Sequence, residues 1–362
     1  MIIGIIGLPQ SGKTTLFNVL CGTHQETGGY TAKGEVHHGV VKVPDARLGV
    51  LAEIYKPKKI THAEIEWMDV AGFTGDTSDR ARVDTEIPNA IREAFAIAHV
   101  VRAFDDPKLP HPAGSVDPER DIKAVEDELI FSDLVGAEKR LEKVERHLKV
   151  SPDDTLRREK AVLEKCLEQL NTEKPLREVE FTPDEQKAIK GFQFLSIKPV
   201  LIILNIGENR LPDRAAIQKQ FAPYDEKQWC AVEVISAKVQ SELAELDPDD
   251  RKVFMDDLGI TGFALDRIVG KSYELLGLIS YLTGGDKEVH AWTINRGTTA
   301  VKAAGVIHKD FEKGFIKAEI VAYDKLVEAG SEAEAKKHGW MRLEGKEYIV
   351  KDGDVIFFRF NV

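Results

Sequence analysis

The chain has 362 residues, which at roughly 150 residues per domain predicts two to three domains and an ample hydrophobic core. An apolar share of 43% with 31% charged residues is typical of a globular protein, and the formal net charge of −11 excludes a general basic coat for nucleic acid. Three widely spaced cysteines exclude a disulfide framework and a CxxC metal site, so we expect a reducing cytoplasm. Because no run of 18 apolar residues occurs, no membrane span is predicted.

Short apolar runs alternate with helical stretches through much of the chain. Ile2–Ile6 is rich in β-branched residues and ends at Gly7, which predicts a central parallel strand; it lacks the basic flank of a signal peptide. Thr14–Leu20 has helical spacing. Further strands are predicted at Val36–Val43, Ile65–Val70, His99–Phe104, Val200–Leu204 and Ala231–Ile235. This alternation predicts an α/β fold with a doubly wound sheet.

Residues 121–190 interrupt the alternation. They contain 14 basic and 18 acidic side chains, and their leucines, valines and alanines recur every three or four positions. Ser151-Pro152-Asp153-Asp154 is typical of a turn with a helix cap. We therefore predict an antiparallel helical hairpin inserted into the α/β domain, with a pair of ordinary surface helices as the alternative.

From about Leu278 the pattern changes to alternating strands. Strands are predicted at Glu288–Ile294, Phe315–Ala322, Tyr348–Val350 and Val355–Phe360, with turns at Gly345 and Asp352-Gly353-Asp354. This segment is predicted to be a separate small α+β domain.

The first strand leads directly into a nucleotide-binding motif. Gly7-Leu-Pro-Gln-Ser-Gly12-Lys13-Thr14 fits the phosphate-loop pattern G-x-x-x-x-G-K-[ST] and lies between a strand and a helix, as the motif requires. Backbone N–H groups and the helix N-terminus would surround the phosphates. Lys13 should contact the β and γ phosphates, and the Thr14 hydroxyl should hold Mg²⁺.

A second motif, Asp69-Val-Ala-Gly72, comes at the end of the apolar strand Ile65–Met68. In GTPase-class proteins this D-x-x-G places a carboxylate near Mg²⁺ and the glycine N–H near the γ-phosphate. We take Lys13, Asp69 and Gly72 as the candidate catalytic residues. Phe73 cannot orient the attacking water as a glutamine would, so hydrolysis should be slow or use another group. Thr31 is a further candidate Mg²⁺ ligand, with an ordinary surface threonine as the alternative.

The base-side motif departs from the GTPase pattern N-K-x-D. Asn205-Ile206-Gly207-Glu208 replaces the aspartate by glutamate, and the extra methylene moves the carboxylate away from a guanine edge. ATP then becomes plausible as the substrate. Ser236-Ala237-Lys238 follows the next strand and matches the last base-side loop of GTPases.

Together these motifs resemble the Obg-like ATPase family, also called YchF. The resemblance extends over essentially the whole chain. It includes the segments Pro44-Asp45-x-Arg47-Leu48, Ile91-Arg92-Glu93, Ala98-His99-Val100-Val101-Arg102, Val116-Asp117-Pro118 and Asn205-x-x-Glu208. Near the C-terminus, Glu288–Ile294, Ala303–Phe315 and Asp352–Phe360 look like the family's TGS domain.

The resemblance implies a cytoplasmic P-loop ATPase of the translation-factor class that hydrolyses ATP and, to a lesser degree, GTP, with Mg²⁺. Its domains would be a nucleotide-binding domain (1–120 and 191–277), a helical hairpin (121–190) and a ubiquitin-like (β-grasp) TGS domain (278–362). The ribosome or ribosomal RNA would be its partner through the hairpin and the TGS domain, and neither DNA nor a membrane is expected.

Transferred by position, the nucleotide would contact Gly7, Gln10, Ser11, Gly12, Lys13, Thr14, Thr15, Asn205, Ile206, Glu208, Ser236 and Ala237, and the metal would contact Thr14, Thr31 and Asp69. Gln10 and Thr14 stand where the family usually has Asn and Ser. The segment 30–35 differs from the usual switch sequence, and Gly75–Arg82 replaces the expected glycine-rich run.

Other chemistry is less well supported. The ten histidines include no H-E-x-x-H pair, and His37-His38 is predicted to lie on a strand with one side chain exposed. Trp292 and Trp340 are interpreted as residues of a small β domain, with RNA stacking as the alternative. Three functional hypotheses stay open: a ribosome-coupled ATPase, a GTP-preferring enzyme, and a nucleotide-dependent binding module with little hydrolysis.

Overall fold

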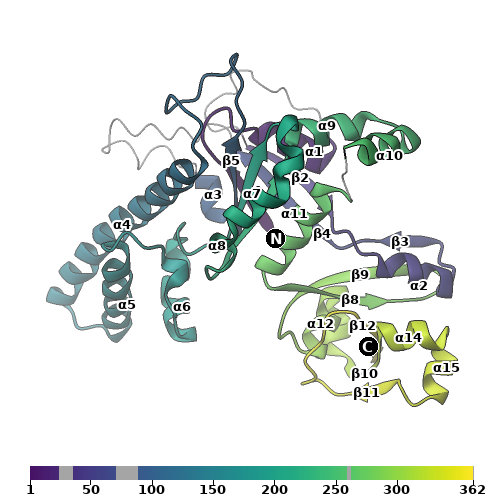
Figure 1. Cartoon of the computed structure of the whole chain (residues 1–362). Coiled ribbons are helices and arrows are strands. Elements are labelled where there is room, and N and C mark those ends of the chain that lie inside the picture. Colours follow the sequence, from purple (N-terminus) through teal and green to yellow (C-terminus); the bar gives the residue numbers. More distant parts are fainter. Residues whose placement is uncertain (24–35, 71–88, 259–261, 362) are drawn as a thin grey trace. The chain divides into compact units, whose positions relative to one another are not determined.

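The computed structural model describes residues 1–23, 36–70, 89–258 and 262–361 (Figure 1). The fold consists of two compact units. Unit 1 comprises Met1–Val40 and Glu66–Ile268, and unit 2 comprises Val41–Ile65 and Val269–Val362. Among the described residues, no helix combines the length and the apolar character that a bilayer span needs.

Unit 1 is built on a six-stranded sheet in the order β2-β4-β1-β5-β6-β7. Its strands are β1 (Ile2–Ile6), β2 (Val36–Lys42), β4 (Glu64–Val70), β5 (Ala96–Ala103), β6 (Val200–Ile206) and β7 (Cys230–Ile235). The pairings of β1 with β4 and β5, and of β6 with β5 and β7, are all parallel. The predicted central position of β1 is therefore confirmed.

The described residues of unit 1 also form helices, only some of which pack on this sheet. They are α1 (Lys13–Cys21), α3 (Asn89–Glu93), α4 (Pro118–Val150), α5 (Asp154–Leu170), α6 (Pro183–Ile189), α7 (Arg214–Gln220), α8 (Ala222–Asp225), α9 (Ala237–Glu245), α10 (Pro248–Asp257) and α11 (Ala264–Leu275), the last of which continues into unit 2. Three short 3₁₀ helices are η2 (Leu176–Glu178), η3 (Lys190–Phe192) and η4 (Glu208–Asp213).

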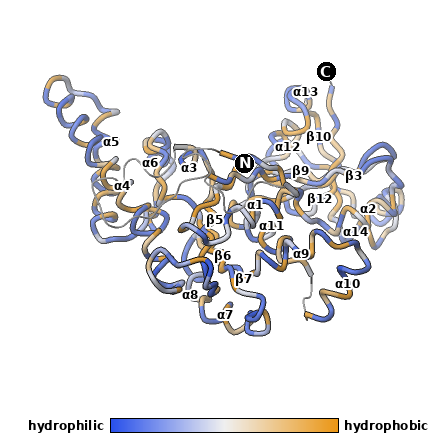
Figure 2. Tube along the Cα trace, turned by 90° about the horizontal axis from the view of Figure 1, so that it is seen from above, coloured by the Kyte–Doolittle hydropathy of each residue, from blue (hydrophilic) through white to orange (hydrophobic). Residues whose placement is uncertain are grey.

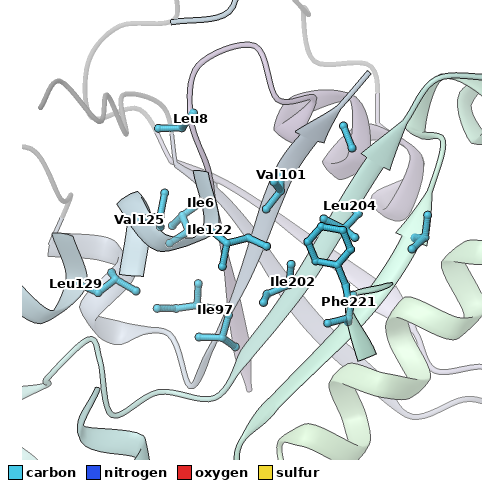
Figure 3. Close-up of a cluster of buried hydrophobic side chains, with 14 of the residues drawn as sticks. Ile6, Leu8, Ile97, Val101, Ile122, Val125, Leu129, Ile202, Leu204 and Phe221 are labelled. Carbon is cyan, nitrogen blue, oxygen red and sulfur yellow. The ribbon is translucent and has the colours of Figure 1, made fainter. Parts of the chain in front are cut away.

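Burial in the core of unit 1 explains why most residues of β5 and β6 are apolar. Every residue of both strands is buried, as expected for parallel strands covered on both faces. In Figure 3 the first turns of α4 place Ile122 and Val125 beside Ile97 and Ile202. Figure 2 colours the chain by hydropathy: the central strands of unit 1 are largely hydrophobic, and the helices of the hairpin are largely hydrophilic.

The predicted helical hairpin is confirmed by α4 and α5, which lie side by side in Figure 1. Asp117 caps α4 by accepting a hydrogen bond from the Arg120 N–H, at 3.1 Å. Asp153 caps α5 by accepting from the N–H groups of Thr155 (2.7 Å) and Leu156 (3.1 Å). The seam between the helices is apolar and includes Ala137, Val144, Val162, Leu163, Cys166 and Leu170.

At its root, the hairpin is attached to the rest of unit 1 through buried polar contacts. The Asp133 carboxylate on α4 accepts hydrogen bonds from the backbone N–H groups of Leu195 (2.8 Å) and Ser196 (2.7 Å). Arg177 of η2 pairs with Glu126 of α4. Because backbone donors hold both oxygens of Asp133, this side chain is one of the contacts that fix the orientation of α4.

Unit 2 has a mixed six-stranded sheet in the order β11-β10-β12-β8-β9-β3. Its elements are α2 (Arg47–Tyr55), β3 (Lys59–Thr61), β8 (Leu278–Thr283), β9 (Glu288–Asn295), α12 (Ala300–Ile307), α13 (Lys309–Lys313), β10 (Phe315–Ala322), α14 (Tyr323–Ala329), α15 (Glu332–Lys337), β11 (Arg342–Glu344) and β12 (Asp354–Phe360). The small residues Ala300, Ala303 and Ala304 of α12 lie in the core beneath the sheet.

Two expectations for this region need correction. Tyr348–Val350 is not a strand: Ile349 forms an isolated bridge with Thr299, because the backbone here bonds to the chain just before α12. The segment Val41–Ile65, expected within the nucleotide-binding domain, belongs to unit 2. There β3 pairs in parallel with β9, and Arg47 forms ion pairs with Asp45 and Asp352, each at 2.8 Å.

Candidate nucleotide-binding site

The predicted phosphate loop connects β1 to α1, and two of its glycines are required by close packing. Gly7 has a φ of 150°, and a Cβ there would collide with the Val100 carbonyl oxygen. Gly12 has a φ of 97° at the N-cap of α1, and a Cβ there would collide with the Asn205 side-chain amide. Gln10 also adopts a positive φ, 62°, at the exposed bend of the loop. The loop can therefore curve around a ligand with its backbone N–H groups.

Lys13 is the cation of this loop. Its ammonium group donates hydrogen bonds to the carbonyl oxygens of Gly7 (2.9 Å) and Leu8 (3.0 Å), so it lies over the concave side of the loop. Burial lowers the pKa of Lys13 from 10.5 to about 8, and the nearby Asp69 carboxylate acts in the opposite direction. A partly desolvated ammonium of this kind is well suited to bind phosphate oxygens.

Thr14 and Asp69 come together although 55 positions separate them. The Thr14 hydroxyl donates to the Asp69 carboxylate at 3.0 Å. Parallel pairing of β1 with β4 causes this contact, since it sets Ile5 opposite Asp69 and brings the carboxyl ends of both strands to one sheet edge. Asp69 is 4% exposed, and burial raises its pKa despite the Thr14 hydrogen bond and the Lys13 charge.

These two oxygen ligands fit Mg²⁺. The ion prefers hard oxygen donors and usually takes one or two from the protein, with water and phosphate oxygens supplying the others. The described residues contain no cluster of three His, Cys, Asp or Glu side chains that could hold a metal by itself. Thr14 and Asp69 therefore suit a metal that arrives with a nucleotide. Three further site residues, Thr31, Gly72 and Phe73, lie outside the described residues, as does the segment Gly75–Arg82.

Asn205 connects the phosphate loop to the base-side loop. Its side-chain amide donates to the Ser11 carbonyl oxygen at 2.9 Å, and its side-chain oxygen accepts from the Ala237 N–H at 2.9 Å. Asn205 is buried at the end of β6, between the ends of β5 and β7. One side chain thus holds two ligand-facing loops in register, a role that the sequence motif alone did not reveal.

The remaining base-side residues differ in exposure. Ile206 is buried in the core, so its side chain supports the loop from beneath. Glu208 begins η4, and its half-exposed carboxylate lies 3.6 Å from the Lys238 ammonium. Ser236 is the buried N-cap residue of α9. Direct contact of these residues with a base stays a prediction, as do the individual roles of Gln10, Ser11 and Thr15.

One buried group near the site was not assigned a role from the sequence. His99 on β5 lies opposite Ile6 at the end of β1 and is 3% exposed. Burial, together with the charge of Lys13, lowers its pKa to about 3, so the imidazole is neutral at physiological pH. Its position within an apolar strand gave no signal beyond the family motif in which it occurs.

This arrangement is that of a P-loop nucleoside triphosphatase. A strand leads through a glycine-bounded loop into a helix that carries Lys13 and Thr14, and Asp69 lies opposite. The chain is 42% identical over 362 residues to the "Ribosome-binding ATPase YchF" of Bacillus subtilis (strain 168), covering 99% of both chains. The chain belongs to the YchF family.

Other comparisons agree with this membership. The "Ribosome-binding ATPase YchF" of Escherichia coli O157:H7 is 40% identical over 360 residues, covering 99% of each chain. The solved YchF GTPase structure from Schizosaccharomyces pombe has a TM-score of 0.83 and 31% identity, covering 99% of this chain and 97% of that one. The family model "50S ribosome-binding GTPase" matches residues 2–130, and YchF-GTPase_C, "Protein of unknown function (DUF933)", matches residues 278–361.

Proposed function

We propose that the chain hydrolyses ATP, with GTP as a weaker substrate, and that it cycles on and off the ribosome. One observation carries the proposal. The phosphate loop with Lys13 and the Thr14–Asp69 pair lies beside a base-side loop in which Glu208 replaces the guanine-binding aspartate. The printed names of the bacterial relatives, each a ribosome-binding ATPase, agree with both halves of the proposal.

Lys13 acts on the phosphates. In the bound state its ammonium exchanges the carbonyls of Gly7 and Leu8 for oxygens of the β and γ phosphates and offsets the charge that develops as the terminal bond breaks. Backbone N–H groups of the loop and the first turn of α1 hold the same phosphates in place.

Thr14 and Asp69 hold Mg²⁺ in this proposal, and Thr31 is a further candidate ligand. When bound, the ion neutralises charge on the β and γ phosphates. The Thr14 hydroxyl donates a hydrogen bond to the Asp69 carboxylate, with 3.0 Å between the two oxygens. This hydrogen bond would leave a lone pair of the hydroxyl oxygen free to bind the ion. Gly72 is proposed to contact the γ-phosphate through its N–H.

On the base side, Asn205 holds both loops while Glu208 faces the base. A guanine-specific site needs a carboxylate at a fixed distance from two N–H groups, and glutamate extends one methylene further than aspartate. The Lys238 ammonium, 3.6 Å from the Glu208 carboxylate, also attracts this carboxylate and so competes with a base for it. Both features weaken selection for guanine and favour ATP.

We further propose a cytoplasmic protein of three parts: a nucleotide-binding domain, the helical hairpin and a TGS domain at 278–362. The mixed sheet of unit 2 with α12 beneath it supports the last assignment, since a helix packed on a mixed sheet is the β-grasp arrangement. The hairpin and this domain offer surface that nucleotide chemistry does not need. The ribosome is the proposed partner for that surface.

Turnover by the protein alone should be slow, on the order of 10⁻⁴–10⁻² s⁻¹, because Phe73 cannot orient water and no arginine finger is assigned.

Phosphate release is measured with ATP and with GTP side by side, with and without ribosomes. Co-sedimentation with ribosomes is measured in ADP and in a non-hydrolysable ATP analogue. We expect ATP turnover above GTP turnover, and a ribosome-dependent change in rate or in the sedimenting fraction.

Three results would revise the proposal. Turnover near 10 s⁻¹ by the free protein, the range of fully activated systems, would indicate a self-sufficient enzyme. No sedimentation in either nucleotide state would remove the ribosome. Binding of ATP without measurable release of phosphate under any condition would leave a nucleotide-dependent binding module.

A further inference from the structure

Charge is distributed unevenly along the helical hairpin. We call residues 139–158, the end of α4 and the start of α5, the hairpin tip. The tip has seven basic and four acidic side chains, whereas the rest of 121–190 has seven basic and fourteen acidic ones. A chain of net charge −11 thus carries a local excess of three positive charges at the end of its helical insertion.

The basic side chains of the tip surround a groove of about 500 Å³. It is lined by Arg140, Lys143, Val144, Arg146, His147 and Leu156. Positions 140, 143 and 147 share one face of α4, because they are separated by three and four residues. They span about 10 Å of helix. Val144 is buried beneath them, so cationic side chains rim a floor that is partly apolar.

Among the described residues, one of the three arginine and lysine side chains that line the groove, Lys143, has no acidic partner. Arg140 is held by Glu159 through two hydrogen bonds of 2.6 and 3.0 Å, and Arg146 lies 3.6 Å from Glu142. Within the described part of the chain, the side chains of Lys143 and His147 form no ion pair or hydrogen bond, and both are exposed. Lys143 therefore offers a charge that no neighbour neutralises.

The groove is also held in a fixed shape. Besides the apolar seam, two ion pairs join α4 to α5 and link the tip to the residues next to it: Arg140 with Glu159, and Lys160 with Glu145 at 2.7 Å. A rigid surface pays little ordering entropy on binding, so fixed cations bind an extended polyanion more tightly than mobile ones.

We propose that the groove at the hairpin tip binds the sugar–phosphate backbone of an RNA strand on the ribosome; this inference rests on the proposed function above. Arginine and lysine suit phosphate oxygens, and the apolar floor accommodates a ribose or the face of an unstacked base. An acidic protein segment is the competing occupant. It fits less well, because carboxylates offer no flat ring for the floor formed by Val144 and Leu156.

The test uses the full chain and a fluorescein-labelled RNA stem–loop, with fluorescence anisotropy over a range of salt. The double change K143E with R146E should weaken RNA binding at least about tenfold and reduce the salt slope by about 2. The matched control is K123E with K187E, which changes net charge equally at exposed lysines of 121–190 outside the groove. Circular dichroism verifies that both variants retain their helices, and K143R with R146K should bind RNA like the wild type.

Ribosome sedimentation of the same proteins separates this inference from the proposed function. If the wild type sediments and the tip variant does not, while the control sediments normally, the inference is supported. If the tip variant binds RNA and ribosomes as the wild type does, the groove is not the contact, and the ATPase proposal is untouched. Equal losses in the control, or equal competition by poly-L-glutamate, would also overturn the inference. Failure of the wild type to sediment would instead remove the ribosome from the proposed function.

Discussion

Among the buried aspartates of unit 1, Asp69 at the phosphate loop and Asp133 at the root of the hairpin differ in what holds the carboxylate. Asp133 is 1% exposed and accepts from two backbone N–H groups, one to each oxygen, with Arg92 3.9 Å away. Asp69 is 4% exposed and accepts from the movable Thr14 hydroxyl, with the Lys13 charge nearby. Burial raises the pKa of both carboxyl groups.

The difference separates an anchor from a ligand site. Backbone donors are fixed and cannot be exchanged, so Asp133 is occupied in every state of the protein. A hydroxyl rotates, and a carboxylate that accepts from one hydroxyl retains lone pairs for a metal ion or its water shell. Equal burial and equal direction of the pKa shift therefore do not by themselves identify a functional carboxylate. The two carboxylates do differ in the type of donor, which is why we propose Asp69 and not Asp133 as a metal ligand.

The largest expected effect is on ligand binding. Lys13→Ala should weaken ATP binding by about 100-fold or more, because two charge-assisted contacts are worth roughly 1.5–3 kcal/mol each. Folding should be unaffected, since a buried ammonium is itself costly. Titration with a fluorescent ATP analogue, together with thermal unfolding, measures both. An affinity within about threefold of the wild type would remove the phosphate-loop assignment.

Asp133→Ala should show the opposite pattern. Two buried N–H groups lose their acceptor, at about 1–3 kcal/mol each, so the free energy of unfolding should fall by about 2–6 kcal/mol. The ATP affinity should stay unchanged when it is measured under conditions in which the variant is fully folded. Urea unfolding measures the loss, with Asp127→Ala as the control: that exposed carboxylate pairs with Lys123 on the same helix and should cost under about 1 kcal/mol. Equal losses for both variants would contradict the anchor role.

A smaller effect is expected from pH. The pKa of Lys13 in the folded protein is lowered to about 8, from an ordinary 10.5. Phosphate needs the charged form, so ATP affinity should fall as pH rises above about 8, by up to about tenfold per pH unit. In the absence of nucleotide the sign is reversed: the unfolded chain binds the proton more tightly, so stability contributed at this residue rises between about pH 8 and 10.5.

Calorimetry with ATP at several pH values measures this dependence, and Lys13→Arg is the control. A guanidinium keeps its charge throughout the range, so the decline attributable to residue 13 should disappear in that variant. A decline of the same size in Lys13→Arg would assign the pH dependence to another group.

The smallest effect is expected on the base side. The change Glu208→Asp should shift preference toward GTP by a few-fold, because the shorter carboxylate can pair with guanine. Calorimetry of both proteins with both nucleotides measures the shift. A wild-type protein that prefers GTP by about tenfold or more would contradict the proposed ATP preference.

The sequence predicted the elements of unit 1 with little error. The apolar runs predicted β1 and β6 closely, whereas β5 begins at Ala96, three residues before the predicted start at His99. Helical spacing with a capped turn predicted α4 and α5, and the phosphate-loop motif predicted a helix after the loop, where Lys13 begins α1. These features are local: a strand buried on both faces is mostly apolar, and a loop that wraps phosphate favours glycine where φ is positive.

What tertiary structure decided lies between segments distant in the chain. β3 has three residues, too few to show a period, and its position beside β9 depends on a partner more than 200 residues away. Asn205 reads as part of a base-binding motif, yet its hydrogen bonds to Ser11 and Ala237 arise only because parallel pairing brings three strand ends together. The lowered pKa of Lys13 is of the same kind, since the surrounding fold buries the ammonium. Side-chain type and local spacing are written in the sequence, whereas burial and donor identity are created when remote segments pack.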